Sequence, residues 1–337
     1  MKRNMTQWIE DMISSPVKKA MPILSFPAIS KMDITVRELI SNSDLQAKAM
    51  EIVASNTNAA ASVSFMDLSV EAQCFGSEIR VSDEEVPTVI GILVNSEEDA
   101  DALAIPEVGS GRTNLYIEAI KISSETITDR PVLAGVIGPF SLAGRLMDVS
   151  EAMIYCYEEP DMVHTVLSKT TAFIINYAKA FKASGANGVV IAEPLAGLLS
   201  PDLAKEFSAD YVKRIVDELQ DDYFKVIYHN CGNGTVSQID SIIATGAPLV
   251  HFGNAIDIRD MVPHIPKNVI FAGNIDPSSQ FKNGTPESIK NDTLNLLNDI
   301  GTLPNFLISS GCDIPPLSKW ENIDSFFNTV DTFYSNK

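Results

Sequence analysis

Residues 224–231 read FKVIYHNC, an apolar run of β-branched and aromatic residues that ends in a histidine and a cysteine. A short apolar run of this kind predicts a buried strand. Seven further runs share its character and alternate with longer helical patterns: MPILSFPA (21–28), ASVSFMDL (61–68), PVLAGVIGPF (131–140), GVVIAEP (188–194), PLVHFGNA (248–255), NVIFAGNIDP (268–277) and FLISSGCDIP (306–315). Eight strands, each followed by a helix, predict an α/β fold of the (β/α)8 TIM-barrel type. A doubly wound open sheet is the alternative, because a sequence does not show closure.

The helical patterns lie between these runs. Apolar residues spaced by three and four predict helices over 160–181, 200–219 and 319–334. Residues 75–94 interrupt the alternation and predict a β-hairpin insertion before a helix at 96–105. We therefore expect residues 1–337 to form a single TIM-barrel domain, with 1–20 as an N-terminal helical extension and 21–337 as the barrel.

Composition and charge exclude several classes of protein. The net charge of −19 argues against binding to nucleic acid or to anionic membranes, which both need a basic surface. No apolar run approaches the roughly 18 residues of a membrane-spanning helix. The four cysteines are unevenly spaced, so they do not form a disulfide framework. We expect a cytoplasmic enzyme with reduced thiols.

Polar residues collect at the predicted strand ends, where barrel enzymes carry out their chemistry. These positions hold Asp67, Glu193, His229, Cys231, Asn254, Asn274, Asp276 and Cys312. The side chains of His229 and Cys231 are two residues apart on an extended segment, so they project to the same side. Together with Cys312 they form a set of three zinc ligands, and an open fourth position is typical of catalytic zinc.

The simpler interpretation of a cysteine at a strand end is a small buried apolar residue. We retain that interpretation for Cys74 and Cys156, which have no comparable neighbours in the sequence. The remaining histidines, His164, His251 and His264, are interpreted as ordinary surface or helix-end residues.

The predicted ligand set indicates a particular chemistry. Zinc with two thiolates and one imidazole is formally neutral and activates water weakly, but it can hold an incoming thiol as a thiolate at neutral pH. Zinc-activated thiol alkylation is therefore the predicted reaction. Glu193 follows an apolar run and precedes Pro194, and we predict that it is catalytic, either accepting the thiol proton or filling the fourth zinc position. The alternative is a residue that only closes the loop. Asp257 and Glu71 are the other candidates for the fourth position.

Four segments, AEPLAGLLSP (192–201), YHNCG (228–232), AGNIDP (272–277) and SSGCDIPP (309–316), resemble the uroporphyrinogen decarboxylase superfamily. They are most similar to its zinc branch, the methylcobalamin:coenzyme M methyltransferases, as is FMDLSVEAQCFG (65–76). The resemblance implies a barrel with Zn²⁺ at its mouth, a small thiol acceptor such as coenzyme M, and a methylated corrinoid donor on a corrinoid-binding partner protein. Among the other polar residues at the strand ends, we predict that Asp67 is a second catalytic residue and that Asn274 and Asp276 are cofactor-binding residues. The alternative for Asp276, which precedes Pro277, is a residue that only caps the segment that follows.

The sequence also departs from the parent superfamily. The arginine-rich N-terminal signature of true uroporphyrinogen decarboxylases is absent, and the corresponding place reads AMPILSFPAIS (20–30). Without those arginines the carboxylates of a porphyrinogen would be unpaired. Three alternatives stay open: transfer to tetrahydrofolate or homocysteine, a zinc-free decarboxylase-like lyase in which Asp67 holds pyrrole nitrogens, and a non-catalytic corrinoid-protein partner. The last predicts a closed structural zinc site, with His251 or a carboxylate as fourth ligand.

Overall fold

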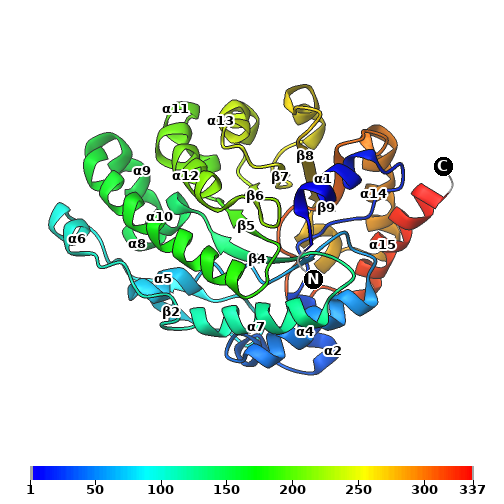
Figure 1. Cartoon of the computed structure of the whole chain (residues 1–337), viewed down its shortest axis with the longest axis horizontal. Coiled ribbons are helices and arrows are strands. Elements are labelled where there is room, and N and C mark those ends of the chain that lie inside the picture. Colours follow the sequence, from blue (N-terminus) through cyan, green and yellow to red (C-terminus); the bar gives the residue numbers. More distant parts are fainter. Residues whose placement is uncertain (1–2, 336–337) are drawn as a thin grey trace.

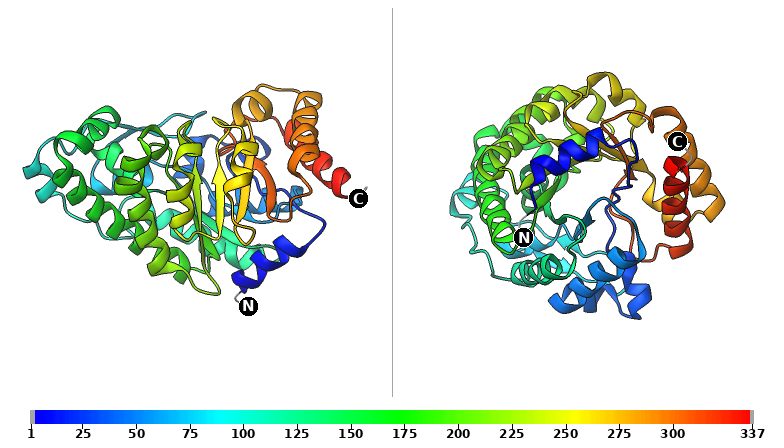
Figure 2. Two further views of the ribbon diagram at one scale, coloured as in Figure 1. Left: turned by 90° about the horizontal axis from the view of Figure 1, so that it is seen from above. Right: turned by 45° about the vertical axis from the view of Figure 1, so that its right-hand side comes forward.

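Seven parallel strands form one curled sheet in a computed structural model that describes residues 3–335. Each strand pairs with the next in the order β1 (Ser62–Val63), β4 (Val132–Ile137), β5 (Gly188–Ala192), β6 (Lys225–Asn230), β7 (Leu249–Phe252), β8 (Ile270–Ile275) and β9 (Phe306–Ser310). Helices surround the sheet (Figures 1 and 2). This arrangement confirms the predicted barrel and excludes the open doubly wound sheet. Residues 1–2 and 336–337, which the predicted domain includes, lie outside the described part of the chain.

An extended segment, residues 20–25, occupies the eighth place of the barrel between β9 and β1. On one side, the amide of Met21 donates to the carbonyl of Ile308 in β9, at 2.9 Å. On the other side, the amide of Ala60, just before β1, donates to the carbonyl of Ala20, at 2.8 Å. The segment therefore joins the two edges of the sheet.

The prediction of a regular strand over 21–28 was wrong. The segment makes too few ladder bonds to count as a strand, and it ends in a short 3-10 helix, η1 (Phe26–Ala28). Pro22 and Pro27 explain the difference, because a proline has no N–H to donate to a ladder.

Helices fill the intervals between the strands much as the sequence predicts. They are α1 (Met5–Ser14), α2 (Ile29–Met32), α3 (Val36–Ile40), α4 (Ser43–Asn56), α5 (Val70–Phe75), α6 (Glu97–Ala102), α7 (Thr113–Thr126), α8 (Pro139–Met147), α9 (Val149–Glu158), α10 (Pro160–Ala183), α11 (Pro201–Ala204), α12 (Asp210–Leu219), α13 (Ile239–Ala244), α14 (Pro286–Ile300) and α15 (Trp320–Ser335). The helix predicted at 200–219 contains a π-helical turn, η3 (Lys205–Ala209). The predicted hairpin is present as β2 (Glu78–Arg80) paired antiparallel with β3 (Thr88–Ile90). Among the described residues, no helix is both long and apolar enough to cross a membrane.

Alternate residues of each strand face opposite sides of the sheet. One set, exemplified by Val190, Ile227 and Leu249, forms a core inside the barrel. The other set, exemplified by Val189 and Val226, belongs to the larger core beneath the surrounding helices. This alternation decides which polar side chains at the strand ends reach the interior.

Helix α1 closes the end of the barrel at which the strands begin (Figure 2, right). Met5 and Trp8 belong to the same apolar cluster as the inward residues of the strands. The following loop is fixed by Lys18, whose Nζ donates to the carbonyls of Met12, Ile13 and Pro304, the last just before β9. The opposite end, where the strands terminate, is called the mouth below.

Candidate metal centre

Three predicted zinc ligands meet at the mouth. His229 lies near the end of β6, Cys231 follows that strand, and Cys312 follows β9. Their ligand atoms all lie within 4.8 Å of one another. His229 faces the interior because it stands two residues after the inward Ile227. In the described part of the chain, no fourth histidine, cysteine or carboxylate joins this group.

A glycine at the end of β7 allows the backbone to pass close behind Cys231. A Cβ atom at Gly253 would lie 2.4 Å from both the Cα and the Cβ of Cys231. That distance is far below van der Waals contact, so a side chain at position 253 would displace Cys231.

The hydrogen bonds of His229 define which ring nitrogen is free to bind a metal. Its Nδ1 lies 2.8 Å from Nδ1 of His251 and 3.3 Å from the backbone carbonyl of His251. A carbonyl oxygen can only accept, so Nδ1 of His229 carries the proton. Nε2 of His229 is then unprotonated, and this buried atom has no hydrogen-bond partner in the protein. A buried lone pair without a donor is suited to coordinate a cation.

The hydrogen bonds of Ser309, which contacts the other ring nitrogen of His251, lead to the same tautomer of His229. The hydroxyl of Ser309 donates to the carbonyl of Met21 at 2.8 Å, so its oxygen accepts from Nε2–H of His251 at 2.7 Å. Nδ1 of His251 is therefore the acceptor for His229. Burial, with the neighbouring His229, holds the pKa of His251 well below its usual range, so this ring is neutral.

This position of His251 corrects the prediction from sequence. His251 is not a surface or helix-end residue but is buried in β7, opposite His229 in the strand register. Both of its ring nitrogens are engaged, one with His229 and one with Ser309, so neither is free to bind a metal.

The two cysteines show how thiolates can be stabilised here. A hydrogen bond from the Cys312 thiol lowers the pKa of Cys231. The same bond, with burial, raises the pKa of Cys312 to about 12. Without a metal, the thiol of Cys231 therefore loses its proton more readily than the thiol of Cys312. A bound cation favours two thiolates by displacing the remaining proton, so this donor set fits zinc.

Glu193 lies outside this group and accepts hydrogen bonds from the start of helix α8. Its Oε1 accepts from the amide of Phe140 at 2.8 Å, and its Oε2 accepts from the amide and hydroxyl of Ser141 at 3.0 and 2.7 Å. The residue continues the outward face formed by Val189 and Ile191, which explains this direction. Burial raises the pKa of Glu193 to about 7. Its role as a thiol base stays a prediction.

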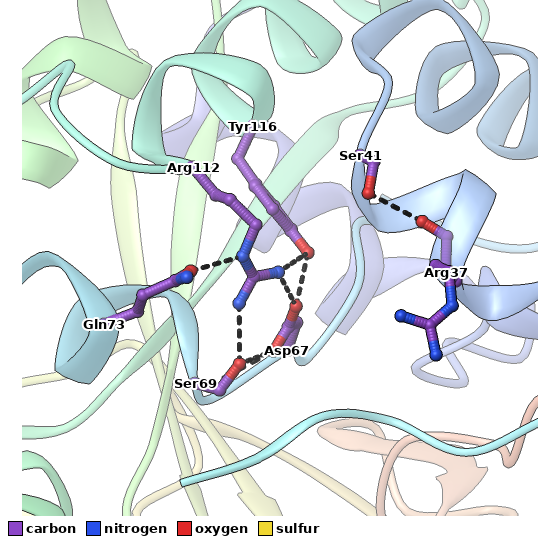
Figure 3. Close-up of polar contacts among 7 residues, drawn as sticks. All are labelled: Arg37, Ser41, Asp67, Ser69, Gln73, Arg112 and Tyr116. Atoms are coloured by element: carbon purple, nitrogen blue, oxygen red, sulfur yellow. Dashed lines mark hydrogen bonds and ion pairs between the residues drawn. The ribbon is translucent and has the colours of Figure 1, made fainter. Parts of the chain in front are cut away.

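Asp67 belongs to a closed polar network near the end of β1 (Figure 3). Its Oδ1 accepts from the amide and hydroxyl of Ser69, and its Oδ2 accepts from Arg112 and from the hydroxyl of Tyr116. The guanidinium also donates to Gln73 at 2.6 Å and to Ser69 at 2.7 Å. All four acceptor positions of the carboxylate are therefore occupied by protein donors. A catalytic role for Asp67 stays a prediction.

The remaining predicted residues make local contacts with the backbone. Asn274 donates to two carbonyls of the loop after β7, each at 2.9 Å. Asp276 accepts from the two amides that begin the π-helical segment η6 (Pro277–Lys282), each at 2.8 Å. Asn274 and Asp276 both line one surface cavity of about 830 Å³. Cofactor binding by these two residues stays a prediction.

The other two candidates for the fourth zinc position, Asp257 and Glu71, interact with other parts of the protein. Asp257 forms an ion pair with Arg259 at 2.7 Å. Glu71 is buried and accepts from the amide of Ile137 at 3.0 Å. The candidate centre therefore offers three protein donors in the described residues, which is the number that an open catalytic zinc site uses.

Comparison with known proteins gives a consistent picture. The sequence profile of the uroporphyrinogen decarboxylase (URO-D) family matches residues 13–333. A methylcobamide:CoM methyltransferase, MtbA, from Methanosarcina acetivorans is 31% identical over 272 residues, which cover 79% of this chain and 78% of the relative. A uroporphyrinogen decarboxylase from Coxiella burnetii is 27% identical over 284 residues, covering 81% and 77%. Among solved structures, a methyltransferase from Methanosarcina mazei matches with a TM-score of 0.85 and 23% identity, covering 98% of both chains.

Proposed function

The chain belongs to the uroporphyrinogen decarboxylase (URO-D) family, and we propose that it is a zinc-dependent methyltransferase within it. The protein is a corrinoid-dependent enzyme that moves a methyl group from a methylated corrinoid to a thiol such as coenzyme M. One observation carries the zinc assignment. The unprotonated, unpartnered Nε2 of His229 lies within 4.8 Å of the sulfur atoms of Cys231 and Cys312.

The residues of this chain prepare the site in three ways. His229 and the two cysteines would hold the ion, and His251 keeps the lone pair of His229 available for it. Zinc bound there supplies positive charge that lowers the pKa of an acceptor thiol, so that the thiolate predominates near neutral pH. The buried carboxyl of Glu193 stabilises the wall of the mouth by fixing the start of α8.

The methyl transfer itself is a displacement between the two substrates. The acceptor thiolate attacks the methyl carbon of the methylated corrinoid, a sulfur–carbon bond forms, and the cobalt–carbon bond breaks. The cobalt of the corrinoid leaves with the electron pair as Co(I). The thiol proton passes to solvent or to a base, for which Glu193 is the candidate.

We further propose that a corrinoid-binding partner protein delivers the donor in the cytoplasm. The alternative of a porphyrinogen lyase is less well supported, because the four acceptor positions of Asp67 are filled by Ser69, Arg112 and Tyr116. A carboxylate so engaged has no free position for pyrrole nitrogens.

Zinc content and turnover test the proposal together. We expect about one zinc per chain, and we expect both the metal and methyl transfer from methylcobalamin to coenzyme M to be lost in Cys231→Ala and Cys312→Ala. Cys156→Ala is the matched control, because Cys156 is buried in α9 and does not belong to the group. Full zinc content in both ligand variants, or thiol methylation that survives chelation, would contradict the proposal.

A further inference from the structure

The hydroxyl of Thr235 bridges the two residues that flank Cys231. Its oxygen lies 2.7 Å from Oδ1 of Asn230 and 2.5 Å from the carbonyl oxygen of Gly232. Both of these atoms can only accept, so the hydroxyl donates its single proton to one or the other. Oδ1 of Asn230 also accepts from the amide of Gly232 at 3.3 Å. Residues 230–235, called the Cys231 loop below, are therefore closed by hydrogen bonds around the candidate ligand.

The bridge is enclosed by protein and lies on the face of β6 opposite to the metal centre. Thr235 is completely buried and Asn230 is 1% exposed, so bulk water does not compete for their hydrogen bond. Side chains alternate along a strand, so Asn230 faces away from the side that His229 and Cys231 share. Thr235 therefore acts on Cys231 through the backbone and does not serve as a ligand.

Backbone contacts on two sides hold the Cys231 loop against its neighbours. A Cβ atom at Gly232 would lie 2.2 Å from the Cα of Gly197, in the loop after β5, so the two loops cross in direct contact. The amide of Gly234 donates to the carbonyl of Gly197 at 3.1 Å. On the other side, the amide of Gly253 donates to the carbonyl of Asn230 at 3.0 Å. These contacts place the loop, and the hydroxyl bridge joins its two ends.

The second cysteine is fixed in another way. The residue after Cys312, Asp313, accepts through Oδ2 from the amide of Met66, beyond the end of β1, at 3.0 Å. The residue after Cys231, Gly232, is bonded to side chains of its own loop. A neighbouring segment of the barrel therefore helps to place Cys312, whereas the place of Cys231 depends on bonds within the loop.

We propose that Thr235 is a positioning residue, which fixes the backbone at Cys231 and so holds its sulfur close to the other two ligands. The inference rests on the proposed function and deepens it, because the affinity for zinc would depend on a residue that does not touch the ion. A ligand that is held in place loses little conformational freedom when it binds a metal. Without the hydroxyl, the residues on either side of Cys231 are no longer joined, and zinc binding must order them.

Zinc affinity tests this inference with a conservative substitution and a matched control. Thr235→Val removes the hydroxyl and keeps the branched shape, whereas Thr235→Ser keeps the hydroxyl. Thr245→Val is the control, because Thr245 is also buried and its hydroxyl donates to the carbonyl of Ile242 at 2.6 Å, the same spacing along the chain as from Thr235 to Gly232. Thr245 precedes β7, at the end of the barrel where the strands begin.

Competition with a chromophoric chelator measures the Kd for zinc in each protein. We expect an increase of about tenfold in Thr235→Val, the lower end of the range for partners behind a metal ligand, because Thr235 acts through the backbone. In Thr235→Ser and Thr245→Val the Kd should stay within about twofold of the wild type.

Cobalt absorption and thermal melting separate a positioning role from a structural one. Co²⁺ in place of zinc absorbs through charge transfer from each thiolate ligand. The absorbance per metal at saturation should therefore be lower in Thr235→Val than in the wild type, and Thr235→Ser should restore it. In the metal-free proteins, Thr235→Val and Thr245→Val should lower the melting temperature by similar amounts, because each loses a buried hydroxyl contact. If Thr235→Val does not fold, Asn230→Ala carries the same test, since it removes the acceptor at the other end of the bridge.

The outcomes separate this inference from the proposed function. If the wild type binds zinc and cobalt, and Thr235→Val equals Thr245→Val in the Kd for zinc and in absorbance per cobalt, Thr235 is only structural. The positioning role is then refuted while the metal centre stands. If the wild type binds neither metal, the zinc assignment of the proposed function fails.

Discussion

Replacing His251 by leucine should weaken zinc binding without removing a zinc ligand. The change deletes the acceptor that lies 2.8 Å from Nδ1 of His229 and leaves only the carbonyl contact at 3.3 Å. The proton of His229 is then less firmly held on Nδ1, and part of the population carries it on Nε2, the atom that must bind the metal. Loss of a hydrogen-bond partner behind a metal ligand typically costs 10–100-fold in affinity. Because the carbonyl remains, we expect the lower end of that range, an increase of about tenfold in the Kd for zinc.

Two measurements follow this effect. Competition with a chromophoric chelator gives the Kd for zinc, and nitrogen-15 NMR of the metal-free protein reports which ring nitrogen of His229 is protonated. His251→Asn should retain much of the affinity because its side-chain oxygen can still accept a hydrogen bond. Ser309→Ala should have a smaller effect than His251→Leu, since it removes only the acceptor behind His251.

A histidine elsewhere serves as the control for this experiment. His164 lies in α10, bonds to Tyr211 at 2.8 Å and stacks on Phe207, so His164→Leu alters packing without touching the centre. The reasoning is refuted if folded His251→Leu keeps a single His229 tautomer and binds zinc as tightly as the wild type and His164→Leu.

Two further predictions concern buried carboxyl groups. Glu193→Gln places an amide nitrogen against the amides of Phe140 and Ser141, so it should reduce the free energy of unfolding by about 1–3 kcal/mol and leave zinc content unchanged. Urea denaturation checks this, and a lower methyl-transfer rate at unchanged stability would instead favour the thiol-base role. Burial raises the pKa of Glu71 from 4.5 to about 7, so its stabilising contribution is complete below pH 4.5 and is lost as the pH rises through 7. The wild type should therefore lose about 3 kcal/mol of stability relative to Glu71→Gln between pH 4.5 and 8 in parallel urea titrations, and equal pH profiles would contradict this.

The barrel and the grouping of His229, Cys231 and Cys312 at its mouth were predictable because they depend on local patterns. Apolar runs such as FKVIYHNC define strands, and a spacing of two residues places His229 and Cys231 on one side of β6. The segment at 21–28 shows the limit of this reasoning. Its composition is that of a strand, and it occupies the place of a strand in the barrel. Its prolines have no N–H to donate, so it does not form a regular ladder of hydrogen bonds.

The direction of Glu193 and the role of His251 also have signals in the sequence. Counting by twos from Val189 and Ile191 assigns Glu193 to the outward face. The same count from Leu249 places His251 inside the barrel, level with His229. What the sequence does not contain is the register between strands, which brings His251 beside His229.

The closure of one end of the barrel by α1 has a kinetic consequence. Helix α1 covers the end of the barrel where the strands begin (Figure 2, right), and its Met5 and Trp8 pack with the inward apolar residues of the strands. We therefore expect a thiol and a methylated corrinoid to approach the centre from the same end, the mouth. A corrinoid is far larger than a two-carbon thiol and would cover the entrance once seated. We therefore expect the small substrate to enter first and its methylated product to leave after the corrinoid has departed. Initial-rate patterns should accordingly be those of an ordered sequential mechanism, with the thiol as the leading substrate and the thioether as the last product released.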